Sequence, residues 1–98
     1  MEKPYIISYD LHEPGQRYAS LKAALENNLK ASWWTHYLES TYLVRTSLSA
    51  QEIVETLKPF LDKDDRMYIF EIKDSNYQGW LNEKEWKSVK TKILGLEG

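Results

Sequence analysis

A mixed α+β fold in a single domain is what this sequence predicts. Short runs rich in β-branched and aromatic residues alternate with segments of helical period. Their order along the chain is strand, helix, strand, strand, helix, strand and a final helix. A length of 98 residues suits one domain, which we assign to residues 1–98. We expect the core in about residues 4–73 and a C-terminal loop and helix in residues 74–98.

The first strand is predicted over residues 5–11, a short run rich in Tyr and Ile. Residues 12–15 contain Pro and Gly and form a loop. Apolar residues then recur with the period of a helix, which is predicted to begin at Gln16 and to end at Asn27 and Asn28. Alternation places one set of residues on a single face of the strand, and the helical period places a second set in one stripe of the helix. The strand set is Tyr5, Ile7, Tyr9 and Leu11, and the helix set is Tyr18, Leu21, Leu25 and Leu29.

Two further strands, residues 33–38 and 41–46, are joined by a tight turn at Glu39 and Ser40. A second helix begins at Ser49, which forms a capping box with Glu52. Pro59 bends or ends that helix. The remaining elements are a strand over residues 66–73 and a last helix that begins at Asn82, which is three residues before Glu85 and carries Trp86, Val89 and Ile93.

This order of elements predicts a ferredoxin-like βαββαβ sandwich with an added C-terminal helix, in which the sheet has the order 4-1-3-2 and both core helices lie on one face. No strand alternates cleanly between apolar and polar residues, because apolar residues occur on both faces. A sheet that is apolar on both faces needs a second cover. We expect the last helix, with Trp80 and Trp86 as packing anchors, to cover part of the second face. A second copy of the chain would cover the rest, so we expect a homodimer.

Adjacent tryptophans open the second strand. Because neighbouring strand residues point to opposite faces, one of Trp33 and Trp34 is expected in the core and the other outside it. The outer one could stack on a nucleobase, or it could pack on a partner subunit or on the last helix.

The predicted topology gathers polar residues at one edge of the sheet, where the first and second strands end and the third and fourth begin. Mg²⁺ accepts one or two carboxylates and keeps most of its waters, so Asp10 together with Asp10 of a second copy could bind it. His12 or His36 could move a proton. The alternative is that these are ordinary turn and cap residues. The group consists of Asp10, His12, His36, Glu39, Ser40, Asp64, Asp65 and Arg66.

The composition limits the class of protein. There is no cysteine, which excludes disulfides, thiolate zinc sites and cysteine nucleophiles. No apolar run is long enough to span a membrane and the N-terminus shows no signal peptide, so we expect a cytoplasmic protein that does not bind a membrane. A formal net charge of −2 gives no strong electrostatic attraction to nucleic acid.

The first strand, residues 6–11, resembles the opening strand of the CRISPR-associated Cas-two family, in which a Tyr-Asp pair (here Tyr9-Asp10) ends the strand. The resemblance covers about residues 4–73 and continues through residues 40–44 and 65–72. The family consists of small ferredoxin-like homodimers, described as metal-dependent endonucleases or as scaffolds in spacer acquisition. The resemblance therefore implies that Asp10 is a magnesium ligand and that Ser40 corresponds to the small polar residue of the second strand region.

A group of Cas-two-like bacterial proteins without an assigned activity resembles the chain more closely. The likeness rests on residues 9–15, on residues 33–41 and on Gly79-Trp80-Leu81. The chain lacks the basic stretch that follows the aspartate in the Cas-two family, and a helix replaces the C-terminal strand that family dimers exchange.

Two functions follow as hypotheses, and the sequence leaves open whether the protein is an enzyme. The first is a Cas-two-like homodimer that acts as a magnesium-dependent endoribonuclease or as a nucleic-acid-associated scaffold. In it Asp10 and His12 would be catalytic, Asp10 would bind Mg²⁺, and His36 and Ser40 would support them. The alternative is a non-catalytic protein-interaction or regulatory module of a toxin–antitoxin or phage-defence system, whose aromatic sheet face binds a protein partner.

Overall fold

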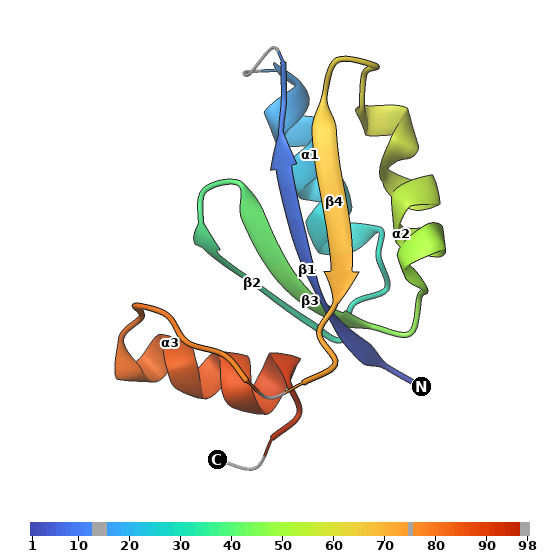
Figure 1. The fold of residues 1–98 in the computed structure, drawn as a ribbon. Helices are drawn as coiled ribbons and strands as arrows, with labels where there is room; N and C mark the ends of the chain where they lie inside the picture. The colour runs from blue at the N-terminus through green and yellow to red at the C-terminus, as the bar shows by residue number, and fades with distance from the viewer. Residues whose placement is uncertain (13–15, 75, 97–98) are drawn as a thin grey trace.

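Four antiparallel strands form one sheet with the order β2-β3-β1-β4 in the computed structural model, which describes residues 1–12, 16–74 and 76–96 (Figure 1). The predicted α+β class is confirmed, and so is the predicted position of the first strand between the third and the fourth. The elements are β1 Lys3–Asp10, α1 Gln16–Asn27, β2 Trp33–Leu38, β3 Thr41–Thr46, α2 Ala50–Leu57, the 3-10 turn η1 Lys58–Phe60, β4 Arg66–Glu71, α3 Glu83–Ser88 and the π-helical turn η2 Val89–Ile93.

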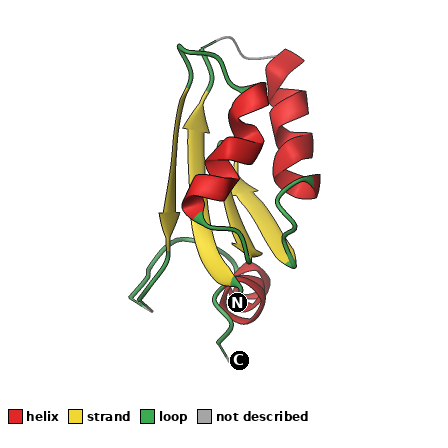
Figure 2. Ribbon diagram, turned by 90° about the vertical axis from the view of Figure 1, so that its right-hand side faces the viewer, coloured by secondary structure: helices red, strands yellow, loops and turns green. Residues whose placement is uncertain are grey.

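The main core lies between one face of the sheet and the helices α1 and α2. These helices lie together on one side of the sheet, whereas α3 lies apart from them (Figures 1 and 2). The residues that alternation places on one face of β1 point into this core, because Tyr5, Ile7 and Tyr9 are all at most 4% exposed. The buried residues of this core are Tyr5, Ile7, Tyr9, Leu11, Leu21, Ala24, Leu25, Leu29, Tyr42, Val44, Ile53 and Leu57.

Local signals set the ends of the helices. The Ser49 hydroxyl accepts the Glu52 N–H, and the Glu52 carboxylate accepts the Ser49 N–H, as the capping box predicts. Asn82 and Glu85 form the same pair at the start of α3. The α-helix α2 ends at Leu57, and Pro59, which has no N–H to donate, lies in the 3-10 turn that follows.

Other boundaries differ from the sequence-based expectations. β1 begins earlier, at Lys3, and ends at Asp10, although Leu11 beyond its end remains buried. β4 ends at Glu71 rather than at residue 73. Of the loop expected over residues 12–15, residues 13–15 lie outside the described part of the chain. None of the helices within the described ranges is both long and apolar enough to cross a membrane.

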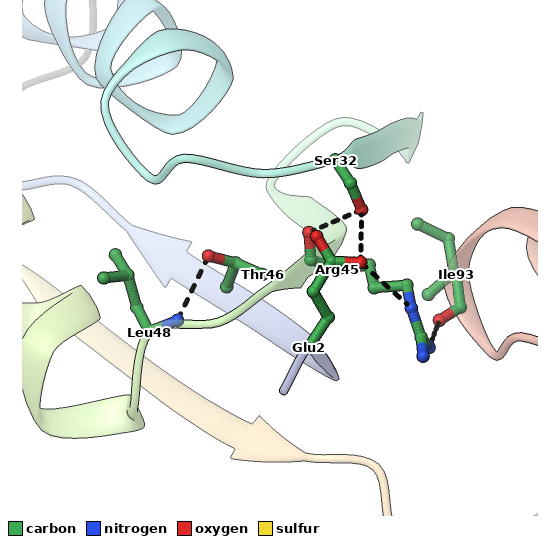
Figure 3. A network of polar contacts seen from close by, with 6 residues as sticks. All are labelled: Glu2, Ser32, Arg45, Thr46, Leu48 and Ile93. Atoms are coloured by element: carbon green, nitrogen blue, oxygen red, sulfur yellow. Dashed lines mark hydrogen bonds and ion pairs between the residues drawn. The ribbon is translucent and has the colours of Figure 1, made fainter.

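Arg45 fastens the C-terminal helix to the sheet (Figure 3). Its guanidinium Nη1 donates to the Ile93 carbonyl at 2.8 Å, while its Nε lies 3.7 Å from a Glu2 carboxylate oxygen. The Ser32 hydroxyl donates to the same Glu2 oxygen at 3.0 Å. Gly95 has a φ of +73°, and its backbone lies so close to Arg45 that a Cβ there would be 3.1 Å from Nη1. The end of η2 is therefore held at β3 by one arginine and one glycine.

Candidate functional site

Polar residues do meet at the edge where β1 ends, as the topology predicts. Asp10 pairs with Arg66 in the β1–β4 register. One Asp65 carboxylate oxygen accepts the His12 N–H at 2.8 Å, and the other accepts the Asp62 N–H at 2.7 Å. Asp65 thus ties the chain after β1 to the turn before β4, which is the structural role of a turn aspartate.

Asp10 lies on the sheet face opposite α1 and α2. It is exposed, and the pleat places it on the same face as Ser8, since Tyr9 between them points into the core. A small hollow of about 140 Å³ beside it is also lined by Arg66 and Tyr68. Asp10 is therefore available to solvent and to any molecule that approaches this face.

His36 lies on the other face. Its ring stacks on the buried Tyr42, with ring centroids 4.1 Å apart and an interplanar angle of 12°, and its Nε2 is 2.8 Å from the Glu39 carbonyl oxygen. The expectation that both histidines and the carboxylates meet at one point is therefore wrong for His36, because the sheet separates it from Asp10. The physical reason is the pleat: His36 has the same facing as Trp34, which also contacts Tyr42.

Ser40 and His12 contribute backbone atoms to this edge. The Ser40 carbonyl accepts the Tyr9 N–H at 3.1 Å, which extends the β1–β3 ladder into the turn. The side chain of His12 is exposed. Within the described part of the chain, no three His, Asp or Glu side chains gather closely enough to hold one metal ion.

Two core tyrosines, Tyr9 and Tyr42, carry buried hydroxyl groups that the sequence analysis did not identify. The Tyr42 hydroxyl donates to a Glu26 carboxylate oxygen at 2.5 Å. The pKa of Tyr42 is raised, mainly by burial and to a smaller extent by this hydrogen bond. Burial also raises the pKa of Tyr9, whose hydroxyl has no hydrogen-bond partner among the described residues. The apolar spacing identified both as core residues, but nothing in the sequence shows which of the two hydroxyls finds a carboxylate.

The second sheet face carries the largest exposed aromatic surface. Tyr68 and Phe70 of β4 are 61% and 60% exposed, and their rings meet edge to face at 5.3 Å. Phe70 lies opposite Ile6 in the β1–β4 register, and Ile6 lies opposite Leu43 in the β1–β3 register. We call the sheet surface formed by Ile6, Ser8, Leu43, Tyr68 and Phe70 the open face.

An apolar groove of about 320 Å³ continues the open face toward β2 and the C-terminal segment. Thr35 lies in its wall and is 5% exposed, and its hydroxyl has no hydrogen-bond partner among the described residues. The groove is lined by Ile6, Thr35, Tyr37, Leu38, Thr41, Leu43, Gln78, Gly79, Trp80, Leu81, Trp86 and Val89.

The tryptophans correct several expectations. Trp86 packs as expected, because its ring lies against Tyr77 and within 3.1 Å of the position of a Cβ on Gly79. Trp80 does not, since it is 100% exposed at the rim of the groove. Neither Trp33 nor Trp34 is buried, because β2 is an edge strand: they are 43% and 37% exposed, and the Lys92 ammonium lies 5.0 Å from the centre of the Trp33 ring.

The last helix covers only part of the second face. η2 packs on β2 and β3, and its residues Val89 and Ile93 are buried. The side chains of β4 on that face remain exposed. The sequence indicated two apolar faces, but it did not show that η2 covers the β2–β3 side and leaves β4 uncovered.

Comparison with known proteins finds no family model, no curated relative and no solved structure that matches this chain.

Proposed function

We propose that this protein is a ferredoxin-like, Cas-two-like interaction module that works in the cytoplasm as a homodimer, paired through the open face of its sheet. The exposure of Tyr68 and Phe70 carries this proposal. Two large aromatic side chains in contact, each about three-fifths exposed on a sheet, form the kind of apolar patch that marks an interaction surface.

The size of the patch supports pairing with a second copy. Tyr37, Tyr68, Phe70 and Trp80 are between 39% and 100% exposed. A large aromatic side chain presents about 150–250 Å², so these four offer on the order of 500 Å² of aromatic surface per copy. A stable interface needs about 800 Å² per partner, and Leu38 and the rim of the groove can supply the rest. A two-fold pair uses one patch twice, so the chain needs no second complementary surface.

Light scattering on the purified protein tests the pairing. We expect a mass near twice 11.6 kDa for the native chain and near 11.6 kDa for Phe70→Glu, which would bury a charge in the interface. Val54→Glu is the matched control, because Val54 is 38% exposed on α2 and lies away from the open face. A native chain that remains monomeric at its highest soluble concentration would contradict the proposal.

For such a module we propose a non-catalytic role as a protein-interaction or regulatory component, of the kind used in toxin–antitoxin or phage-defence systems. The aromatic face and the net charge of −2 suit a protein partner better than a nucleic acid. Co-purification from the native host with and without Phe70→Glu would test it. A protein partner retained equally by both forms would bind elsewhere than on the open face.

A magnesium-dependent nuclease is the second candidate, and the position of Asp10 favours it. Asp10 is exposed on the same face as Ser8, and the hollow beside it reaches Tyr68 of the open face. Pairing through that face would bring two Asp10 carboxylates toward one axis, and two carboxylates with water ligands satisfy Mg²⁺. Bound there, the ion would polarise a phosphate oxygen. His12, exposed near the same edge, would then hold or move a proton.

Cleavage of a mixed RNA and DNA panel tests the nuclease. We expect magnesium-dependent cutting by the native protein and its loss in Asp10→Asn, which keeps the shape of the side chain but removes the charge. His36→Asn is the control, because His36 lies on the opposite face. Cutting that persists in Asp10→Asn would remove Asp10 from the reaction, and no cutting by the native dimer would leave the interaction module.

A further inference from the structure

A hollow of about 540 Å³ opens between α3 and the segment that precedes it. That segment runs from the end of β4 back along α3 (Figure 1). The volume lies within the range of about 300–1,000 Å³ that small-molecule sites occupy. The lining residues with rings, charges or an amide are Tyr77, Gln78, Glu83, Trp86, Lys87 and Lys90.

Two aromatic rings form one wall of this hollow. Tyr77 and Trp86 are both half-buried, and their ring centroids lie 5.6 Å apart with an interplanar angle of 33°. The Trp86 ring also packs closely on the chain before α3, because a Cβ on Gly79 would lie 3.1 Å from it. Packed rings that keep part of their surface in solvent are suited to stacking on a flat ligand ring. The Gln78 carboxamide beside them offers a donor and an acceptor, as the edge of a nucleobase requires.

Two lysines bring positive charge to the same hollow. Lys87 and Lys90 are exposed and three positions apart, so they lie on one side of the helical segment. Among the described residues, no carboxylate forms an ion pair with either ammonium group. Glu83 is the acidic residue of the described lining, which leaves an excess of one positive charge. The π-helical turn η2 begins between the two lysines, at Val89, and such turns are frequent at functional sites.

We infer that this hollow binds a free mononucleotide, with the base stacked on Tyr77 and Trp86 and the phosphate held by the Lys87 and Lys90 ammonium groups. A nucleotide joins a flat aromatic ring to a phosphate in one molecule, which is the combination that the lining offers. One phosphate suits two lysines, whereas a nucleic acid strand would bring further phosphates to a protein with a net charge of −2. The site does not depend on the proposed pairing, because none of its residues belongs to the open face.

Titration of the full chain with adenosine monophosphate, followed by amide NMR, tests the site. We expect a dissociation constant on the order of 0.1–1 mM, with shifts in residues 77–78 and 83–91. Adenosine alone and inorganic phosphate alone should each bind at least about 10-fold more weakly, because each makes only one of the two contacts. Phe70→Glu should bind the nucleotide as the native protein does.

Substitutions separate the two halves of the site. Lys87→Gln and Lys90→Gln should each weaken binding of the nucleotide about 3- to 10-fold and leave binding of adenosine unchanged. Tyr77→Leu should weaken the nucleotide and adenosine by the same factor, because both use the ring. Lys84→Gln is the matched control, since Lys84 lies on the same helix but is not among the lining residues.

The outcomes that would overturn the site are distinct. No shift in these residues at about 10 mM nucleotide would exclude it. Phosphate alone that binds as tightly as the nucleotide would overturn the contact with the base, and an equal loss in Lys84→Gln would show general attraction to lysines. A short single strand that binds more tightly at the same residues would overturn the free nucleotide as the ligand. A monomeric native chain that binds the nucleotide would overturn the pairing and leave this site intact.

Discussion

The Arg45 guanidinium donates a hydrogen bond of 2.8 Å to the Ile93 carbonyl, across 48 positions of the chain. This contact joins the end of η2 to β3, and a Glu2 carboxylate on the other side of the guanidinium holds it in place (Figure 3). The groove depends on this contact, because Trp86 and Val89 in its wall belong to the segment that Arg45 fastens.

Arg45→Met should therefore loosen the C-terminal element while leaving the main core folded. It removes the donor but keeps most of the aliphatic stem. We expect a loss of about 1–2 kcal/mol in the free energy of unfolding, since a hydrogen bond from a charged donor is lost. Amide hydrogen exchange should accelerate at Leu94 and Leu96 and stay native in β1. Arg66→Met, at an exposed edge of β4, is the control. Equal exchange in both variants would contradict the anchoring role.

Gly95→Ala should destabilise the same junction. The φ of +73° is unfavourable for alanine, and the new Cβ would lie 3.1 Å from the Arg45 guanidinium. We expect a loss of about 1 kcal/mol or more in thermal unfolding. Lys30 offers the reverse test: it has a φ of +54°, so Lys30→Gly should be neutral or stabilising. A neutral Gly95→Ala would show that the turn relaxes away from Arg45.

Removing one hydroxyl from each of two core tyrosines should have opposite effects. Tyr42→Phe leaves the Glu26 carboxylate without its donor and should cost about 1–3 kcal/mol. Tyr9→Phe removes a buried hydroxyl that has no partner among the described residues, so it should be neutral or stabilising by up to about 1 kcal/mol. Denaturant unfolding of both variants measures the difference. A costly Tyr9→Phe would reveal a partner for that hydroxyl.

The stability should fall at alkaline pH. Burial raises the pKa of both Tyr9 and Tyr42 above the ordinary value of 10.0, so the folded state holds the two protons more tightly than the unfolded state does. The contribution of these two protonated hydroxyls to the free energy of unfolding is complete below pH 10.0, and it is lost as the pH rises above that value. The free energy of unfolding should decline by up to about 1.4 kcal/mol per pH unit for each tyrosine. Tyr42→Phe should have a shallower slope than the native protein, and an unchanged slope would assign the effect elsewhere.

Local signals in the sequence predicted the local structure well. The strands over residues 33–38 and 41–46 have the predicted bounds. The two-residue turn between them fixes where the first strand ends and where the second begins. Both capping boxes form as predicted, since each needs only residues three positions apart. The strand order was predicted as well, because short connections leave few ways to arrange these elements.

The candidate site was harder to predict because it depends on which face each residue occupies. Asp10 and His36 reach the same edge but lie on opposite faces of the sheet, and this depends on the phase of the pleat in two separate strands. Trp80 was expected to pack and instead points to solvent, whereas Trp86 packs against Gly79. The Thr35 hydroxyl was missed altogether, since only the folded groove shows that it has no partner among the described residues.

The partial cover of the second face also fixes the geometry of any pair that forms there. The C-terminal helix occupies the β2–β3 side, so a partner can lie flat on this face only over β1 and β4. The groove beside β2 would then lie at the border of that flat contact. The outer edge of β2, which begins at Trp33 and Trp34, would stay free of it and available to a further partner.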